Sequence, residues 1–379
     1  MTLRALWCAY PWDLIDAPDA ASRARDTGAD GIALAAAYHG VRAATPLHPR
    51  HRLVDAQHSA IYVPYRAEIW RGHRIRPRPA GDWVSEGAFQ SAATSARAAG
   101  LEVEPWVVLT HHDDRGGDGG SLRVHNAFGD VYGYALCPSH EAVREYCATL
   151  ASESVLLSGA ESVVVEACGP LGVEHLGAHE KTTGSDWSAL DAALLSICFC
   201  NECERAMAAA GHDPDAVRNR VRGGVGSGAA RIDQVLADAT TAVLDVRRSA
   251  RDLLAHVVSV AARAAGAKKV RFHAQPDPWA TGPFAALWDT PGVADALILP
   301  ADHLSARERL RAPQNGERLG AYLSVLPPEN PEGFATLWAS RLRGVDDLYL
   351  YHLGLASAQR VDAGAAVIDA VRVAGDPGR

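Results

Sequence analysis

Short apolar runs alternate with stretches of helical pattern along the whole chain, and this alternation predicts its fold. The runs are continuous stretches of Val, Ile, Leu and Ala, which is typical of strands covered on both faces, as in a parallel sheet. They predict eight strands, over residues 3–10, 31–37, 101–109, 162–166, 269–273, 294–299, 319–325 and 347–352. Helical stretches lie between them, including residues 18–27, 82–99, 331–342 and 357–374.

Eight strand–helix units in one chain favour an α/β fold of the (β/α)8 type, the TIM barrel, over an open doubly wound sheet. No Gly-x-Gly-x-x-Gly follows an early strand, which counts against a dinucleotide-binding sheet. We therefore predict that residues 1–379 form a single barrel domain with long loops at its C-terminal face.

Two of the predicted connections are much longer than the others. Residues 38–81 form a long loop after strand two that is rich in His, Arg, Pro and aromatic residues. Residues 167–266, after strand four, combine an extended loop with a helical insertion, are interrupted by glycines at 223–228, and carry a cysteine cluster. Loops of such length in a compact domain usually serve a function.

Composition and charge narrow the range of partners. A formal net charge of −8 and a pI near 6.0 argue against a nucleic acid or an anionic membrane as partner. Residues 1–10 lack a basic segment followed by a long apolar core, so we expect no signal peptide. No run approaches the roughly 18 apolar residues of a membrane span. The chain is predicted to be cytoplasmic, and its nine Trp and long loop leave a homo-oligomer open.

In a (β/α)8 barrel the chemistry collects at the C-terminal ends of the strands. This chain places aromatic, imidazole and carboxylate side chains at nearly every such end. Aromatic rings can stack on sugar faces and polar side chains can bind hydroxyl groups, so the set suits a small-molecule carbohydrate. The predicted substrate-binding residues, from the strand ends and the loops that follow, are Tyr10, Trp12, Tyr38, His39, His111, His112, Asn126, Glu174, His175, His273, Gln275, Asp302, Tyr351 and His352.

Glu166 is the strongest single catalytic candidate. Three valines precede it, so it is the first polar group to leave the predicted strand four. Partial burial there would raise its pKa, and a carboxylic acid that stays protonated near neutral pH can act as a general acid. The competing interpretation is a structural carboxylate hydrogen-bonded to the neighbouring strand.

Three cysteines lie within six residues, at Cys198, Cys200 and Cys203. This spacing places three soft ligands close enough to hold one tetrahedral ion, and a fourth must come from elsewhere. We select Cys137, at the start of the helix after strand three. Four thiolates would form a closed, structural zinc site. The alternative is a set of unmetallated thiols in a reducing compartment.

The order of these residues resembles the family 42 glycoside hydrolases, the bacterial β-galactosidases. Members with a zinc site have a Cys after strand three, an acid/base Glu ending strand four, and a Cys-x-Cys-x-x-Cys beyond it. Here those positions are Cys137, Glu166 and the cluster that starts at Cys198. The resemblance implies a TIM-barrel glycosidase with Glu166 as acid/base and a structural zinc ion.

Two positions depart from the family pattern. The family has Asn before its acid/base Glu, whereas this chain has Val165. Its nucleophile is a Glu that ends strand seven, whereas this strand offers Ser324 and, a few residues later, Glu329. We therefore predict Glu329 as the second catalytic carboxylate, with Asp302 and Asp277 as alternatives.

Three functions are consistent with the sequence. The first is hydrolysis of a glycoside or sugar-like small molecule, with Glu166 as general acid/base. The second is isomerisation or elimination on a sugar by histidines that hold a metal or act as acid and base. The residues for this second function would be His39, His111, His112, His273 and His352. The third is a sugar-binding barrel without catalytic activity.

Overall fold

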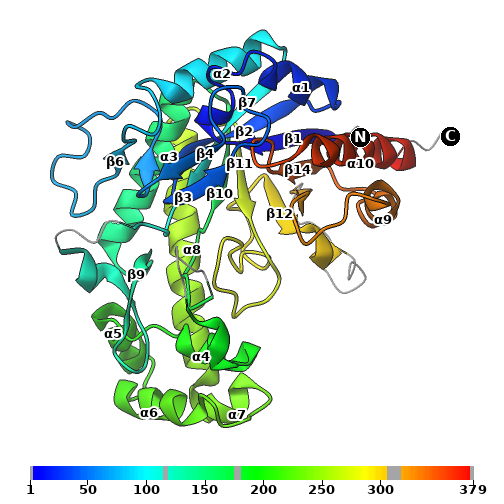
Figure 1. Cartoon of the computed structure of the whole chain (residues 1–379). Helices are drawn as coiled ribbons and strands as arrows, with labels where there is room; N and C mark the ends of the chain where they lie inside the picture. Colours follow the sequence, from blue (N-terminus) through cyan, green and yellow to red (C-terminus); the bar gives the residue numbers. More distant parts are fainter. Residues whose placement is uncertain (1–2, 114–117, 175–180, 305–316, 376–379) are drawn as a thin grey trace.

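The computed structural model describes residues 3–113, 118–174, 181–304 and 317–375. Eight parallel strands follow one another around a closed barrel, in which β1 pairs with both β2 and β14 (Figure 1). The barrel strands are β1 (Arg4–Ala9), β2 (Gly31–Tyr38), β7 (Glu102–Val108), β10 (Ser162–Glu166), β11 (Lys269–His273), β12 (Ala296–Pro300), β13 (Arg318–Ser324) and β14 (Asp347–Tyr351). The predicted (β/α)8 barrel is confirmed.

Helices lie between the barrel strands and cover the outside of the barrel (Figure 1). The α-helices are α1 (Ala20–Asp26), α2 (Ala88–Ala98), α3 (Glu141–Ser158), α4 (Ala189–Leu195), α5 (Asn201–Ala209), α6 (Pro214–Gly224), α7 (Ile232–Leu236), α8 (Thr240–Ala264), α9 (Phe334–Arg341) and α10 (Ala358–Gly375). Strands such as β10 are buried on both faces, which explains why they are continuous apolar runs in the sequence.

Residues 38–81 contain more regular structure than the sequence predicts. The strands β3 (Val41–Ala44) and β4 (Leu53–Ala56) form a hairpin, and β5 (Ala60–Ile61) adds antiparallel to the end of β2, followed by β6 (Arg78–Pro79). A second hairpin, β8 (Arg123–His125) and β9 (Val131–Leu136), follows β7. Strands of two to six residues are too short for a hydrophobic period to identify them.

The segment after β10 leaves the barrel and returns to it. Helices α4, α5, α6 and α7 form a group at one end of the molecule, and the 25-residue helix α8 runs from this group back along the barrel beside α3 (Figure 1). Among the described residues, no helix is both long and apolar enough to cross a membrane.

The barrel interior near the amino ends of the strands holds an ion-pair network. Glu104 on β7 accepts hydrogen bonds from Arg271 on β11 and, at 2.6 Å, from the Tyr349 hydroxyl on β14. Arg4 on β1 lies 3.5 Å from the same carboxylate. Because β7 is paired with none of these three strands in the sheet, the contacts of Glu104 cross the barrel interior and tie its walls together.

Candidate active site and cysteine cluster

Glu166 lies where the sequence analysis expected it, at the carboxyl end of β10. Its side chain is buried, with 5% of the residue exposed. The Trp106 Nε1–H on the neighbouring strand β7 donates to Glu166 Oε2 at 2.9 Å. Burial raises the pKa of Glu166 to about 8, and the Trp106 hydrogen bond opposes this only in part. The carboxyl group is therefore protonated at neutral pH, as a general acid must be.

A second buried carboxyl group, that of Asp13, lies at another strand end. Asp13 belongs to a short 3-10 helix (Pro11–Asp13) after β1, and its Oδ2 accepts the Tyr10 backbone N–H at 2.8 Å. Burial raises the pKa of Asp13 to about 7, although the Tyr10 hydrogen bond lowers it. A Cβ atom at Gly354 would lie 2.0 Å from this carboxyl group, so only glycine fits there.

Two neutral imidazoles lie beside these acids. His273 Nδ1 lies 3.6 Å from Glu166 Oε2, and His352 Nδ1 lies 3.7 Å from Asp13 Oδ2. Burial lowers the pKa of both histidines to about 3. The Gly354 backbone N–H donates to His352 Nδ1 at 3.2 Å, so neutral His352 carries its proton on Nε2. That Nε2 is buried and has no hydrogen-bond partner among the described residues.

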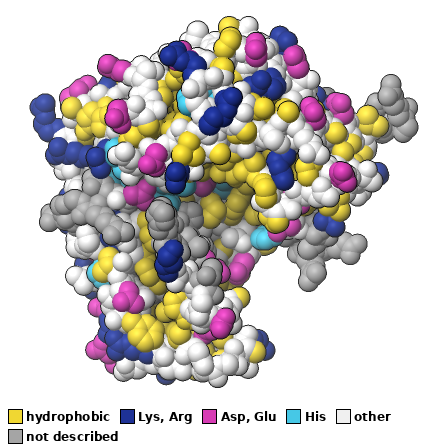
Figure 2. Space-filling model, viewed as in Figure 1, with side chains coloured by type: hydrophobic (Ala, Val, Ile, Leu, Met, Phe, Trp, Pro, Cys, Tyr) yellow, Lys and Arg dark blue, Asp and Glu magenta, His cyan; other side chains and the backbone are white. Residues whose placement is uncertain are grey.

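Aromatic rings from several barrel strands surround the two acids. The Trp106 ring lies 4.7 Å from Tyr38 and 6.2 Å from Tyr351, measured between centroids. Tyr322 on β13 lies 5.4 Å from Tyr351 and 5.2 Å from His273. Figure 2 shows that this view of the molecule is hollowed between the barrel and the helices α4 to α7, with hydrophobic side chains inside the hollow.

His39 and His111 extend this aromatic wall and are held by Asp113. The two imidazole rings stack at 4.3 Å. Asp113 accepts from His111 Nε2 at 2.9 Å, from the Gly40 backbone N–H at 2.6 Å and from Ser59 Oγ at 3.1 Å. Burial raises the pKa of Asp113, but the hydrogen bond and charge of His111, the Gly40 N–H bond and the charge of His39 together outweigh it, and the net pKa lies well below the usual range.

Six of the predicted binding residues thus lie around the two carboxyl groups, where they are connected by contacts between rings and with Glu166. They are Tyr10, Trp12, Tyr38, His273, Tyr351 and His352. The predicted site residues do not include Asp13, Trp106, Tyr322 or Asp113. Trp106 and Tyr322 lie inside strands, where the sequence does not distinguish an inward ring at the barrel mouth from an ordinary core residue.

Other predicted binding residues have local structural partners. The Asn126 side chain forms the turn between β8 and β9, accepting from the backbone N–H groups of Phe128 and Asp130. Gln275 Nε2 donates to the Phe284 carbonyl oxygen at 2.9 Å. His112 is buried with its Nδ1 3.3 Å from Arg123.

The remaining predicted residues lie at the periphery or outside the described ranges. Glu174 is exposed and lines a pocket of about 280 Å³ together with Trp187. Asp302 is exposed. His175 lies outside the described residues.

Strand β13 ends at Ser324, as the sequence analysis expected, and Glu329 lies on the loop beyond it. Glu329 is half-buried, and Arg360 Nη1 donates to its backbone carbonyl oxygen at 3.0 Å. Asp277 Oδ1 accepts the Trp279 backbone N–H at 2.9 Å within a turn. Among the described residues, neither carboxylate forms a hydrogen bond or ion pair with Glu166, so their catalytic role stays a prediction.

The four selected cysteines come together as one buried cluster. Cys137 follows β9, Cys198 and Cys200 lie between α4 and α5, and Cys203 lies in the first turn of α5. Their sulfur atoms all lie within 4.8 Å of one another. Cys137 Sγ is 3.6 Å from Cys203 Sγ and 3.7 Å from Cys200 Sγ.

These separations fit a metal ion. Four sulfurs at about 2.3 Å from a tetrahedral zinc ion would be about 3.8 Å apart. Hydrogen bonding, first with Cys137, lowers the pKa of Cys200 far below the usual range, while burial raises the pKa of Cys198 and hydrogen bonding raises that of Cys203. Within the described residues no other three His, Cys, Asp or Glu side chains are grouped in this way. The predicted set of strand-end histidines therefore does not form such a group there.

The sequence matches no known family model and no curated protein. The structure is similar to solved barrels. One is an alpha-L-fucosidase isoenzyme 2 from Paenibacillus thiaminolyticus, with 13% sequence identity and a TM-score of 0.56. The match includes 98% of this chain and 49% of the fucosidase chain. Another is the catalytic domain of beta-amylase from Paenibacillus polymyxa, with 12% identity, a TM-score of 0.56 and 99% of both chains covered.

A third similar structure is the PgaB (BpsB) glycoside hydrolase domain from Bordetella bronchiseptica, with 15% identity and a TM-score of 0.55. The match includes 97% of this chain and 99% of that domain. This chain spans about half the length of the fucosidase chain. At such low identities the likeness shows a common fold, the TIM barrel, and the roles of individual residues have to come from their own geometry.

Proposed function

We propose that this protein is a glycosidase-like hydrolase that acts on a glycoside or sugar-like small molecule, with Glu166 as general acid/base. The observation that carries the proposal is the carboxyl group of Glu166, which is buried at the end of β10 and accepts a hydrogen bond from Trp106, and whose pKa burial raises to about 8. The solved barrels similar to this one are named as a fucosidase, an amylase and a glycoside hydrolase domain. The family 42 resemblance of the sequence supports the same chemistry.

The residues of the site suit the steps of such a reaction. A sugar ring between the aromatic side chains would place its glycosidic oxygen near Glu166, which would transfer its proton to that oxygen as the bond to the leaving group breaks. A second carboxylate is needed to attack the sugar or to activate water. Asp13 joins Glu329, Asp302 and Asp277 as a candidate because it is buried beside His352.

The test is the turnover of a panel of aryl glycosides by the wild type and by Glu166→Gln. Loss of a general acid costs about 10²- to 10⁴-fold in rate, and we expect a loss of that size in kcat. The matched control is Glu161→Gln, an exposed glutamate just before the same strand that pairs with Lys268. Equal turnover by the wild type and Glu166→Gln would contradict the assignment of Glu166.

A sugar-binding barrel without catalytic activity is the second candidate, favoured by the end of β13 at Ser324 in place of a glutamate. It predicts saturable binding of an oligosaccharide with no product after long incubation. Acid/base chemistry by the neutral imidazoles of His273 and His352, as in a sugar isomerase or lyase, is the third. It would be separated from hydrolysis by products that retain every atom of the substrate.

We also propose that Cys137, Cys198, Cys200 and Cys203 hold a structural zinc ion that connects the segment after β9 to α5. The closed set of four thiolates leaves no open position for a substrate. Elemental analysis of the purified protein should find one zinc ion per chain. That zinc should be lost in a Cys198→Ser, Cys200→Ser variant and kept in a control variant of the isolated buried Cys147→Ser. A wild-type protein prepared without chelator that holds no zinc would contradict this proposal.

A further inference from the structure

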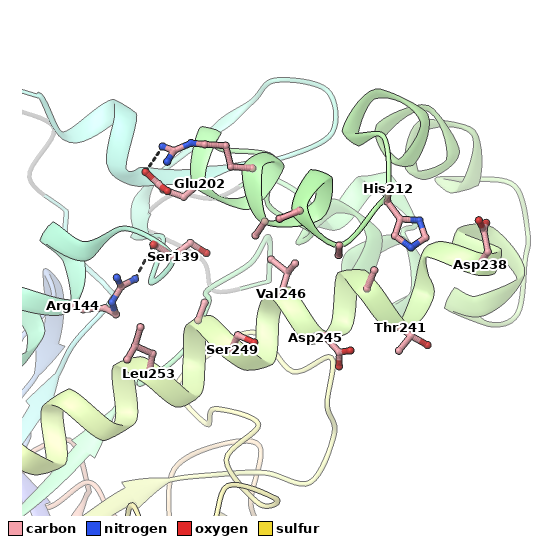
Figure 3. Close-up of a pocket in the computed structure, with 16 residues that line it drawn as sticks. Ser139, Arg144, Glu202, His212, Asp238, Thr241, Asp245, Val246, Ser249 and Leu253 are labelled. Atoms are coloured by element: carbon pink, nitrogen blue, oxygen red, sulfur yellow. Dashed lines mark hydrogen bonds and ion pairs between the residues drawn. The ribbon is translucent and has the colours of Figure 1, made fainter.

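A groove lies on the outer surface of the molecule, away from the strand ends. Helices α5 and α8 form its two walls, and the start of α3 closes one end (Figure 3). Its volume is about 910 Å³. Small side chains form much of the lining, from Ala206, Ala209 and Ala210 on one side and from Ala242 and Ala250 on α8. Alanine walls allow another polypeptide to approach the helix backbones closely.

The apolar lining continues as a strip along α8. Val246, Leu253 and Val260 follow one another at seven-residue spacing, which places them on one face of the helix. Leu253 is 45% exposed and Val260 is 53% exposed. Leu156, on the neighbouring helix α3, is 51% exposed. From Thr241 to Val260 the strip is about 29 Å long, at about 1.5 Å per residue.

The groove carries opposite charges at its two ends. Arg144 and Glu202 line the end near α3, and Asp238 and Asp245 line the other end (Figure 3). Arg205 also lines the groove and pairs with Glu202. The guanidinium group of Arg144 donates to two backbone carbonyl oxygens, which leave its charge uncompensated.

The ion pairs that these side chains already make are exposed. Arg205 pairs with Glu202, and Asp238 and Asp245 pair with Arg220 and Arg248, which do not line the groove. Exposed pairs of this kind contribute little, on the order of 0–1 kcal/mol, and rearrange easily. The charged ends are thus available to new partners.

We infer that this groove and the α8 strip bind a second copy of this chain in a two-fold dimer. In a two-fold interface both copies use the same surface, so this surface must be complementary to itself. Every contact then occurs twice, once in each direction. An apolar centre between a positive and a negative end meets this condition when α8 of one copy runs antiparallel to α8 of the other. Arg205 of each copy then faces Asp238 and Asp245 of its partner.

The dimensions and the chemistry of the groove agree with this occupant. A strip about 29 Å long, widened by the flanking helices α3 and α5, is of the size that a standard interface of roughly 800 Å² per partner requires. Among the residues that line the groove there is no Phe, Tyr or Trp on which a sugar ring could stack, and its one ring is the imidazole of His212.

The first experiment measures the mass of the full-length chain by sedimentation velocity from about 1 to 100 μM. We expect a dimer for the wild type. Ala209→Arg places a long charged side chain in the groove and should raise the dissociation constant at least about 100-fold. The matched control is Ala208→Arg, an exposed alanine of the same helix that does not line the groove, and it should leave the dimer intact.

The second experiment tests the orientation by charge reversal. Asp245→Arg should weaken the dimer about 10-fold, because it then faces Arg205 of the partner. Adding Arg205→Glu to the same chain should restore the affinity, since the two charges are exchanged in both copies. Far-ultraviolet circular dichroism and the thermal midpoint show that each variant is folded.

Three results would overturn the inference: a wild-type monomer at 100 μM, a dimer that Ala209→Arg leaves unchanged, or a trimer or larger ring. Restoration by the double variant would support the antiparallel two-fold arrangement, and its absence would contradict that arrangement. None of these outcomes depends on whether the chain hydrolyses glycosides.

Discussion

Glu104 and Glu166 are both buried inside the barrel, Glu104 near the amino ends of the strands and Glu166 at their carboxyl ends. Burial raises the pKa of Glu104, but the charges of Arg271 and Arg4 outweigh it, and its net pKa is lowered. Glu166 has no such cation, and burial raises its pKa to about 8. The same side chain is therefore ionised at one end of the barrel and protonated at the other.

This difference in protonation assigns a stabilising role to the amino end of the barrel and a chemical role to its carboxyl end. At the amino end, a charged carboxylate with two guanidinium partners and the Tyr349 hydroxyl connects strands across the barrel. At the carboxyl end, Glu166 holds a proton at neutral pH that a reaction can use. A functional carboxyl end and a structural amino end are the usual division of a TIM barrel. Asp347 is an intermediate case, because its arginine partners lie at 3.4–3.8 Å and its pKa is raised by burial despite them.

The largest effect is expected from breaking the ion pairs at the amino end. Arg271→Met removes a cation that contacts both Glu104 and Asp347 and leaves buried carboxylates with too little compensation. We expect a loss of about 3–5 kcal/mol in the free energy of unfolding, measured by urea denaturation at pH 7. Lys269→Met, an exposed position on the same strand, is the control and should change little. Equal stabilities for the two variants would mean that the network does not hold the barrel together.

The next effect concerns Glu166 and depends on pH. The folded protein keeps the proton of this carboxyl group up to a pKa of about 8, whereas the unfolded chain loses it near 4.5. The stability that this proton gives is therefore complete below pH 4.5 and is lost as the pH rises through about 8. Glu166→Gln has no proton to lose, so its stability relative to the wild type should rise over this range and then level off.

The expected gain of Glu166→Gln is a few kcal/mol, at about 1.4 kcal/mol for each unit of pKa shift. It is measured as the difference between the two free energies of unfolding at each pH from 4 to 9, with Glu161→Gln as control. Because the other titrating groups are common to both proteins, their contributions cancel. A difference that does not change with pH would show that Glu166 ionises normally in the folded state.

The smallest of the three effects is expected at Asp13, where the pH range over which the stability changes lies lower than for Glu166. Asn keeps an oxygen for the Tyr10 N–H bond but does not titrate. The folded pKa is about 7 and the unfolded value is 3.8, so Asp13→Asn should gain stability over the wild type between these limits. The gain should level off near pH 7 and not near pH 8. Coincident end points for the Asp13 and Glu166 variants would indicate that the two acids titrate together.

The elements of this protein were largely predictable because their signals are local. A strand buried on both faces needs consecutive apolar residues, and these runs identified the strands of the barrel, including the limits of β10 and β11. The position of Glu166 follows from the same run, since the first polar residue after it comes at the strand end. The spacing of Cys198, Cys200 and Cys203 on one short segment likewise identified the cysteine cluster, and the nearness of Cys137 is confirmed.

The environment of each side chain was decided by residues far away in the sequence. Glu166 takes its hydrogen bond from a residue 60 positions earlier, and Glu104 pairs with one 167 positions later. The local sequence places Glu104 inside a strand and Glu166 at a strand end, but only the closed barrel brings guanidinium groups to one and an indole to the other. Asp13 was overlooked for the same reason, because its burial against Gly354 exists only when β1 and β14 lie side by side. Hydrophobic periodicity is a property of neighbouring residues, whereas a pKa depends on what the closed barrel brings within a few ångströms.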